Sequence, residues 1–236
     1  MKRIEEKTGW EASRGEVLFS DVVLEAAGEH PKLQRAMRAQ VERWSAIDAV
    51  RRAADDGVVR ANARIAWSDR VLDRAVQRFA NELLRDAGGD KDDKGFRAYF
   101  PEAPNEVVRL GLESEIARCE RFGTVRKKVA LSKGAAAKLG EVEAAMAAGK
   151  VALKARREAF AARTEASLDV ATWKDATNAA RESVYVQLRT WAIEHGEERG
   201  YAERFFPVGG GRATRAAAAE GGGEGGGGGA DGKPTG

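Results

Sequence analysis

Two tryptophans and two Phe-Pro pairs recur at a common spacing, and this recurrence constrains the fold more than any other feature of the sequence. Each tryptophan precedes an aspartate by two residues, and an aromatic-Phe-Pro sequence follows at the same distance in both copies. The landmark residues are Trp67, Asp69, Phe100 and Pro101 in the first copy and Trp173, Asp175, Phe206 and Pro207 in the second. We interpret the pattern as an internal duplication that covers residues 1–106 and 107–212.

The composition favours an all-α protein. Charged residues make up 33% of the 236 residues and aromatic residues 7%, with five prolines. Ala, Arg, Glu, Leu and Val dominate the chain up to Pro207, and these residues form helices more readily than strands. Residues 213–236 are rich in glycine. Such a segment loses much entropy on ordering and buries little, so we expect a flexible tail there.

Apolar residues in the first copy recur every three or four positions from Leu33 to Ala54, which predicts an amphipathic helix. Asp55-Asp56-Gly57 predicts a bend, after which the apolar stripe continues to about Ala87. The second copy has similar stripes. Each copy is therefore predicted to be a helical hairpin with a short leading helix, and the two hairpins to pack as an antiparallel four-helix-type bundle. An alternative is that residues 31–87 form one nearly continuous rod.

The aromatic landmarks are interpreted as core residues. Aromatic side chains at matching places in a duplicated bundle fill its core and seal its ends, and a Phe-Pro pair stops a helix. Asp69 and Asp175 are expected to bond polar neighbours at the bundle end. This interpretation requires that Trp67 and Trp173 occupy equivalent, mostly buried sites.

No catalytic residue, cofactor site or metal site is expected. The Glu-x-x-His pairs of a di-iron bundle are absent, since Ala27 and Ala192 precede the two histidines by three residues. His30, before a proline, is expected in an exposed linker, and His195 near a helix C-terminus, where a protonated histidine is favourable. Cys119 is the only cysteine. It has no neighbouring histidine in the sequence to activate it and is expected to be inert.

The segment from Asp90 to Gly95 resembles a calcium loop in part. Asp90, Asp92 and Gly95 match positions 1, 3 and 6, but Lys94 stands at position 5 and Pro101 at position 12. These two residues remove ligands and add a positive charge. We therefore expect a solvated loop.

The second half of the chain carries an excess of basic residues, while the formal net charge of the whole is +3. Polyanion binding is considered for six of them: Arg118, Arg121, Arg126, Lys127, Lys128 and Lys133. Clustered basic side chains bind phosphates electrostatically, but they also solvate helix surfaces. No other nucleic-acid-binding signature accompanies them.

The sequence thus favours a non-enzymatic helical protein that binds a protein partner or self-associates. The alternative function is nucleic-acid or polyanion binding through the basic face of the second repeat. No apolar run approaches the roughly 20 residues of a membrane helix, so membrane insertion is not expected. The lone cysteine and the composition favour a bacterial cytoplasmic protein.

Overall fold

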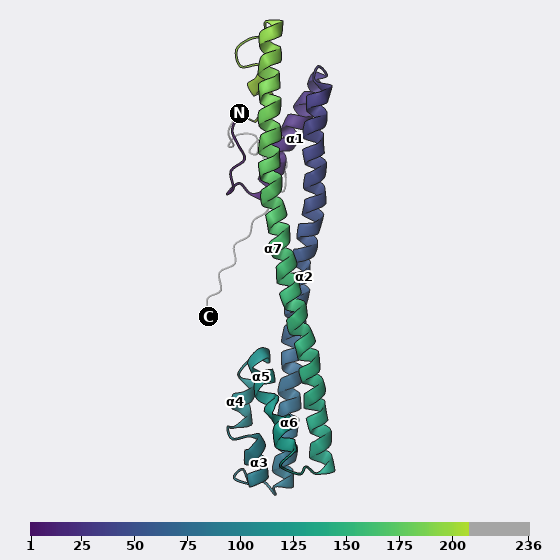
Figure 1. The fold of residues 1–236 in the computed structure, drawn as a ribbon, viewed down its shortest axis with the longest axis vertical. Coiled ribbons are helices and arrows are strands. Elements are labelled where there is room, and N and C mark those ends of the chain that lie inside the picture. Colours follow the sequence, from purple (N-terminus) through teal and green to yellow (C-terminus); the bar gives the residue numbers. More distant parts are fainter. Residues whose placement is uncertain (208–236) are drawn as a thin grey trace, which may run out of the picture. The chain divides into compact units, whose positions relative to one another are not determined.

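The computed structural model describes residues 1–207, which form helices and contain no strand. The all-α class is confirmed for these residues, and the predicted flexible tail lies outside them. The helices are α1 (Trp10–Ala27), α2 (Pro31–Asp86), α3 (Lys94–Tyr99), α4 (Pro104–Val108), α5 (Leu112–Cys119), α6 (Arg121–Arg126), α7 (Lys133–His195) and a 3₁₀ turn, η1 (Ala202–Phe205) (Figure 1). No helix in this part of the chain has both the length and the apolar composition needed to cross a bilayer.

The described residues form two compact units. Unit 1 comprises residues 1–44 and 171–207, and unit 2 comprises residues 45–170. Unit 1 contains α1, η1, the start of α2 and the end of α7, whereas unit 2 contains α3 to α6 and the remainder of the two long helices. Each unit is built from both halves of the sequence, so the units do not coincide with residues 1–106 and 107–212.

The hairpin predicted within each half is wrong, because α2 and α7 are each a single continuous helix. Helix α2 runs for 56 residues through Asp55-Asp56-Gly57, and α7 runs for 63 residues. The continuous rod considered as the alternative is what the structure has for residues 31–86 (Figure 1).

Ion pairs around Gly57 explain why the helix does not break. Asp55 pairs with Arg51 at 3.2 Å, and Asp56 pairs with Arg60 at 3.7 Å, both at i,i+4 spacing along α2. Asp55 also pairs with Arg163 of α7 at 3.1 Å. A glycine within a helix costs only about 1 kcal/mol relative to alanine, which local pairs and packing can offset.

A glycine and a proline set the boundary between α1 and α2. Gly28 has φ of 71°, and its N–H donates to the Leu24 carbonyl, which ends α1. Glycine adopts this left-handed conformation without the strain of a side chain. Pro31 then opens α2, where its fixed φ suits the first helical turn.

In unit 1, α2 and α7 pack in opposite directions around Trp173. The Trp173 side chain is fully buried, and its Nε1 donates to the Gln40 carbonyl at 3.0 Å. Its ring lies 5.0 Å from that of Trp10, which stacks on Trp44 at 5.1 Å. Phe206 is also buried, in the apolar core of this unit.

In unit 2, aromatic side chains from three segments form the core. Phe79 of α2 contacts the rings of Tyr99, Phe100 and Phe122 at centroid distances of 5.2–5.9 Å. All four are at most 1% exposed. Phe100 therefore packs as a core residue, as its landmark position predicted.

Trp67 departs from the predicted symmetry. Its side chain is 62% exposed, whereas Trp173 is fully buried, so the expectation of equivalent buried sites is wrong. The partners explain the difference. At the 106-residue offset between the two copies, Trp10 and Trp44 correspond to Ile116 and Lys150. Neither of these residues has an aromatic ring that could cover Trp67.

Candidate functional site

The six basic residues considered for polyanion binding lie between α5 and the start of α7, but they do not act alike. Three of them form ion pairs or hydrogen bonds within unit 2. Arg118 pairs with Glu102 at 3.1 Å, and Arg126 pairs with Glu143 at 3.5 Å. Arg121 donates to the Tyr99 carbonyl at 2.8 Å. These three guanidinium groups are already engaged inside unit 2.

The other three basic residues face solvent. Lys127, Lys128 and Lys133 are exposed, and none of them forms an ion pair with another described residue. They border the loop between α6 and α7. Only this half of the predicted basic set offers free positive charge.

The exposed Trp67 belongs to an apolar groove on unit 2, which we name the Trp67 groove. Its lining comes from both long helices: Ala63, Arg64, Trp67 and Ser68 of α2, and Ala148, Val151, Ala152 and Ala155 of α7. Val151 is 69% exposed, even more than Trp67. Four of the eight lining residues are alanines, and the side chains of Trp67 and Val151 are largely exposed to solvent.

Further apolar side chains of both long helices are exposed within unit 2. Val59, one helical turn before Ala63, is 67% exposed, and Leu168 of α7 is 64% exposed. A single exposed apolar residue is ordinary, but a groove with an exposed tryptophan is a feature of interaction sites.

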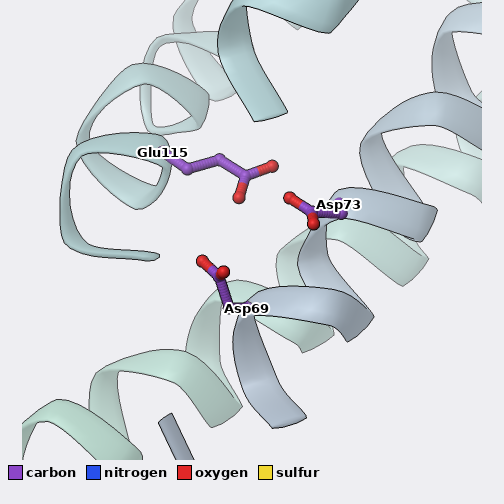
Figure 2. A group of neighbouring side chains, drawn as sticks. All are labelled: Asp69, Asp73 and Glu115. Carbon is purple, nitrogen blue, oxygen red and sulfur yellow. The ribbon is translucent and has the colours of Figure 1, made fainter. Parts of the chain in front are cut away.

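A second feature of unit 2 is a cluster of three carboxylates, which we name the carboxylate cluster. Asp69 and Asp73 stand one turn apart on α2, and Glu115 reaches them from α5 (Figure 2). One oxygen from each residue lies within 4.8 Å of the others. Figure 2 shows the three carboxylates directed toward one another.

Several oxygens of the carboxylate cluster lack a hydrogen-bond partner. Glu115 is fully buried, and neither of its carboxylate oxygens has a hydrogen-bond partner. One oxygen of Asp69 and one of Asp73 are likewise buried without a partner. Among residues 1–207, no lysine, arginine or histidine forms an ion pair with any of the three. A buried carboxylate without a counter-charge is costly.

Burial, together with the negative charges of Asp73 and Asp69, raises the pKa of Glu115 to about 8. Burial also raises the pKa of Asp73. Two carboxylates cannot hydrogen bond each other unless one carries a proton. The Glu115 group therefore requires either a proton or a cation near neutral pH.

Cys119 lies one turn after Glu115 on α5. Burial, with a smaller effect of the Glu115 charge, raises the pKa of its thiol to about 12. The side chain is 1% exposed. A buried thiol with a raised pKa is a poor nucleophile, which agrees with the inert role expected of Cys119.

The sequence did not reveal the carboxylate cluster. In the sequence, Asp69 stands out only as part of the repeat, and no motif marks Asp73 or Glu115. The Asp-x-x-x-Asp spacing on a helix was a readable signal, because residues four apart share a face. Nothing in the sequence indicated that α5 would bring Glu115 to that face.

The acidic loop after α2 is occupied by local structure. Asp90 accepts a hydrogen bond from the Asp92 N–H at 2.8 Å, and Asp93 caps α3 by accepting from the Phe96 N–H at 2.9 Å. Asp92 also pairs with Arg97. These contacts describe an ordinary polar turn.

The two histidines have structural partners. The exposed linker role predicted for His30 is wrong: the side chain is 6% exposed, and its Nε2 lies 2.9 Å from the Tyr201 hydroxyl. Residues 201–205 return to cover it, and this contact is too distant in sequence to be foreseen. His195 is exposed at the end of α7, where it stacks on Trp191 and bonds the Trp191 carbonyl at 2.8 Å.

Comparisons of the chain with protein-family models, with curated proteins and with solved structures gave no match.

Proposed function

We propose that this protein is a non-enzymatic helical protein that self-associates through the Trp67 groove. The observation that carries the proposal is an exposed tryptophan beside an alanine-lined hollow on the same surface of unit 2. Tryptophan is enriched among the residues that dominate binding energy at protein interfaces. Its large apolar ring gains more from burial than a smaller side chain would.

The groove favours a second copy of the same chain as its occupant. A two-fold interface uses the same patch on both partners, so the patch must be complementary to itself. The Trp67 groove contains both a projecting aromatic side chain and a hollow lined by small residues. Trp67 of each copy can lie in the alanine-lined hollow of the other, and Arg64 is the only charged residue of the lining.

The stretch of unit 2 next to the groove lies outside both apolar cores, although Val58, Ala61 and Ala166 in it are buried. The unit 2 core draws on residues from Leu72 onward in α2 and up to Ala145 in α7, with Ile65 and Leu153 at its edge. Residues 45–64 and 154–170 contribute to neither core cluster of the described chain. Two helices without a third element bury little apolar surface, so a second helical pair would add stability there.

A sedimentation-velocity comparison tests this assignment. Replacing Trp67 with Glu is expected to weaken the dimer at least about thirtyfold, because an interface hot spot contributes about 2 kcal/mol or more. The matched control is Ile193→Glu, at an exposed apolar residue (78%) of α7 in unit 1. The control should dimerise like the natural chain. If the Trp67→Glu protein dimerises as strongly as the natural chain, the Trp67 groove is not the dimer interface.

The surroundings of the residues that could act as a nucleophile or a base support the proposed absence of enzymatic activity. Cys119 is buried with a raised pKa, and both histidines have structural contacts within unit 1. The proposed setting is the bacterial cytoplasm, which is compatible with a single unpaired cysteine.

The proposed duplication is supported by the order of elements rather than by the tryptophans. In each half of the chain at least one shorter helix precedes a long helix, and a short segment with a buried aromatic-Phe pair follows it. Tyr99-Phe100 closes the first half in this way and Phe205-Phe206 the second. The unequal burial of Trp67 and Trp173 counts against full equivalence.

Polyanion binding is the second candidate function, and the exposure of Lys127, Lys128 and Lys133 favours it. Substituting all three with Glu should abolish retention on heparin, and retention of the natural chain should fall steeply with salt. Substituting exposed Lys2, Lys32 and Lys91 with Glu provides a control with the same change of charge. No retention of the natural chain at low salt would eliminate this function.

A further inference from the structure

We propose that Asp69, Asp73 and Glu115 form a binding site for one hard divalent cation, of the class of Ca²⁺, Mg²⁺ and Mn²⁺. The site lies wholly within unit 2 and joins α5 to α2 (Figure 2). It is separate from the Trp67 groove and does not depend on self-association.

The first argument is the orphaned carboxylate of Glu115. The side chain is fully buried, points toward Asp69 and Asp73, and leaves both oxygens without a hydrogen-bond partner. A merely structural carboxylate at such depth would be expected to accept backbone or side-chain hydrogen bonds. The Glu115 oxygens therefore require either a bound cation or a proton shared with Asp73, and the arrangement of the three carboxylates favours the cation.

The second argument is the convergence of two helices on one point. Asp69 and Asp73 share a face of α2 because they are four residues apart. Glu115 comes from α5, 42 positions beyond Asp73, and still brings an oxygen within 4.8 Å of both. Oxygens bound on opposite sides of Ca²⁺ are separated by roughly 4.6–5.2 Å, and those on adjacent sides by less. The cluster thus has the spacing of ligands around one ion.

The third argument concerns the kind of cation. All three ligands are carboxylate oxygens, and oxygen-only sites favour Mg²⁺, Ca²⁺ and Mn²⁺ over softer metals. Cys119 is near Glu115 in sequence, but its thiol is not among the clustered ligand atoms. Asp69 and Asp73 are only partly buried, so water can complete the coordination from their side.

Binding would have a local mechanical effect. Helix α5 has eight residues, too few to be stable without tertiary contacts. It already packs on α7, where a methyl group on Gly149 would come within 2.9 Å of Leu112 and Ile116. A cation held between Glu115 and the two aspartates would fix the other side of α5 to α2.

Electron paramagnetic resonance with Mn²⁺ tests the site on the full chain after metal removal with a chelator. The free Mn²⁺ signal should fall by one equivalent per chain and return when Ca²⁺ or Mg²⁺ is added in excess. In a mildly alkaline buffer, Glu115→Gln should weaken Mn²⁺ binding by about tenfold or more. Asp73→Asn should weaken it as well, and this second variant keeps Glu115 in place.

The control is Asp92→Asn, which removes an exposed carboxylate from the loop after α2 and should bind Mn²⁺ normally. Calorimetric scans provide a second readout: Mn²⁺ should raise the unfolding temperature of the natural chain by more than that of folded Glu115→Gln. Unchanged free Mn²⁺ signal at millimolar concentration would overturn the proposal. Equal binding by the natural chain and both cluster variants would overturn it too, and a proton shared by Glu115 and Asp73 would then account for the cluster.

Discussion

At the scale of single residues, His30 shows how burial decides the charge of a side chain. The Tyr201 hydroxyl donates its proton to Glu29 at 3.1 Å, so the Nε2–H of His30 must be the donor in the 2.9 Å bond between the two rings. Neutral histidine satisfies this arrangement. Burial lowers the pKa of His30, and the nearby Glu29 charge opposes this effect without reversing it.

The lowered pKa makes stability depend on pH. Below about pH 6.5 the unfolded chain protonates His30 while the folded chain resists, so the free energy of unfolding should fall as the pH falls through that value. Urea titrations between about pH 7.5 and pH 5.5 should show a smaller loss for His30→Gln than for the natural chain. His195→Gln, at an exposed site, is the control. An identical pH slope for His30→Gln and the natural chain would contradict this assignment.

At the scale of elements, the continuity of α2 is the main departure from the sequence-based expectation. The local composition at Asp55-Asp56-Gly57 is that of a turn, but both aspartates bind arginines one helical turn away. The contact between Asp55 and Arg163 links residues more than a hundred positions apart. Local propensity could not include such a contact.

Substituting Gly57 tests this continuity. A methyl group there would meet no atom within 4 Å, and the residue is helical. Gly57→Ala should therefore raise the free energy of unfolding by roughly 0.5–1 kcal/mol. Gly88→Ala, at a position with φ of 63°, should lower it by about 1 kcal/mol. Urea denaturation measures both changes, and destabilisation by Gly57→Ala would indicate a break in α2.

The sequence predicted the helical class and the burial of Phe100 and Phe206, because these depend on local patterns. It did not predict the two features of unit 2 on which the proposals rest. The exposure of Trp67 depends on which residues face it from other helices. The isolation of Glu115 depends on where α5 packs, which no spacing within the sequence encodes.

At the scale of the whole molecule, the two compact units differ in whether their aromatic and ionisable side chains are covered by other residues. In unit 1, Trp10 and Trp44 gather around Trp173, and the His30 side chain is covered by residues from the end of the chain. In unit 2, Trp67 faces solvent and three carboxylates face one another. Both proposed binding sites, the Trp67 groove and the carboxylate cluster, therefore lie in unit 2.

The molar mass of the natural chain in solution tests the proposed self-association most directly. Size-exclusion chromatography with light scattering, run over a range of concentrations, should give a mass near twice the 25.4 kDa of one chain at high concentration. That mass should decrease toward 25.4 kDa on dilution. A mass of one chain at every concentration would contradict self-association through the Trp67 groove.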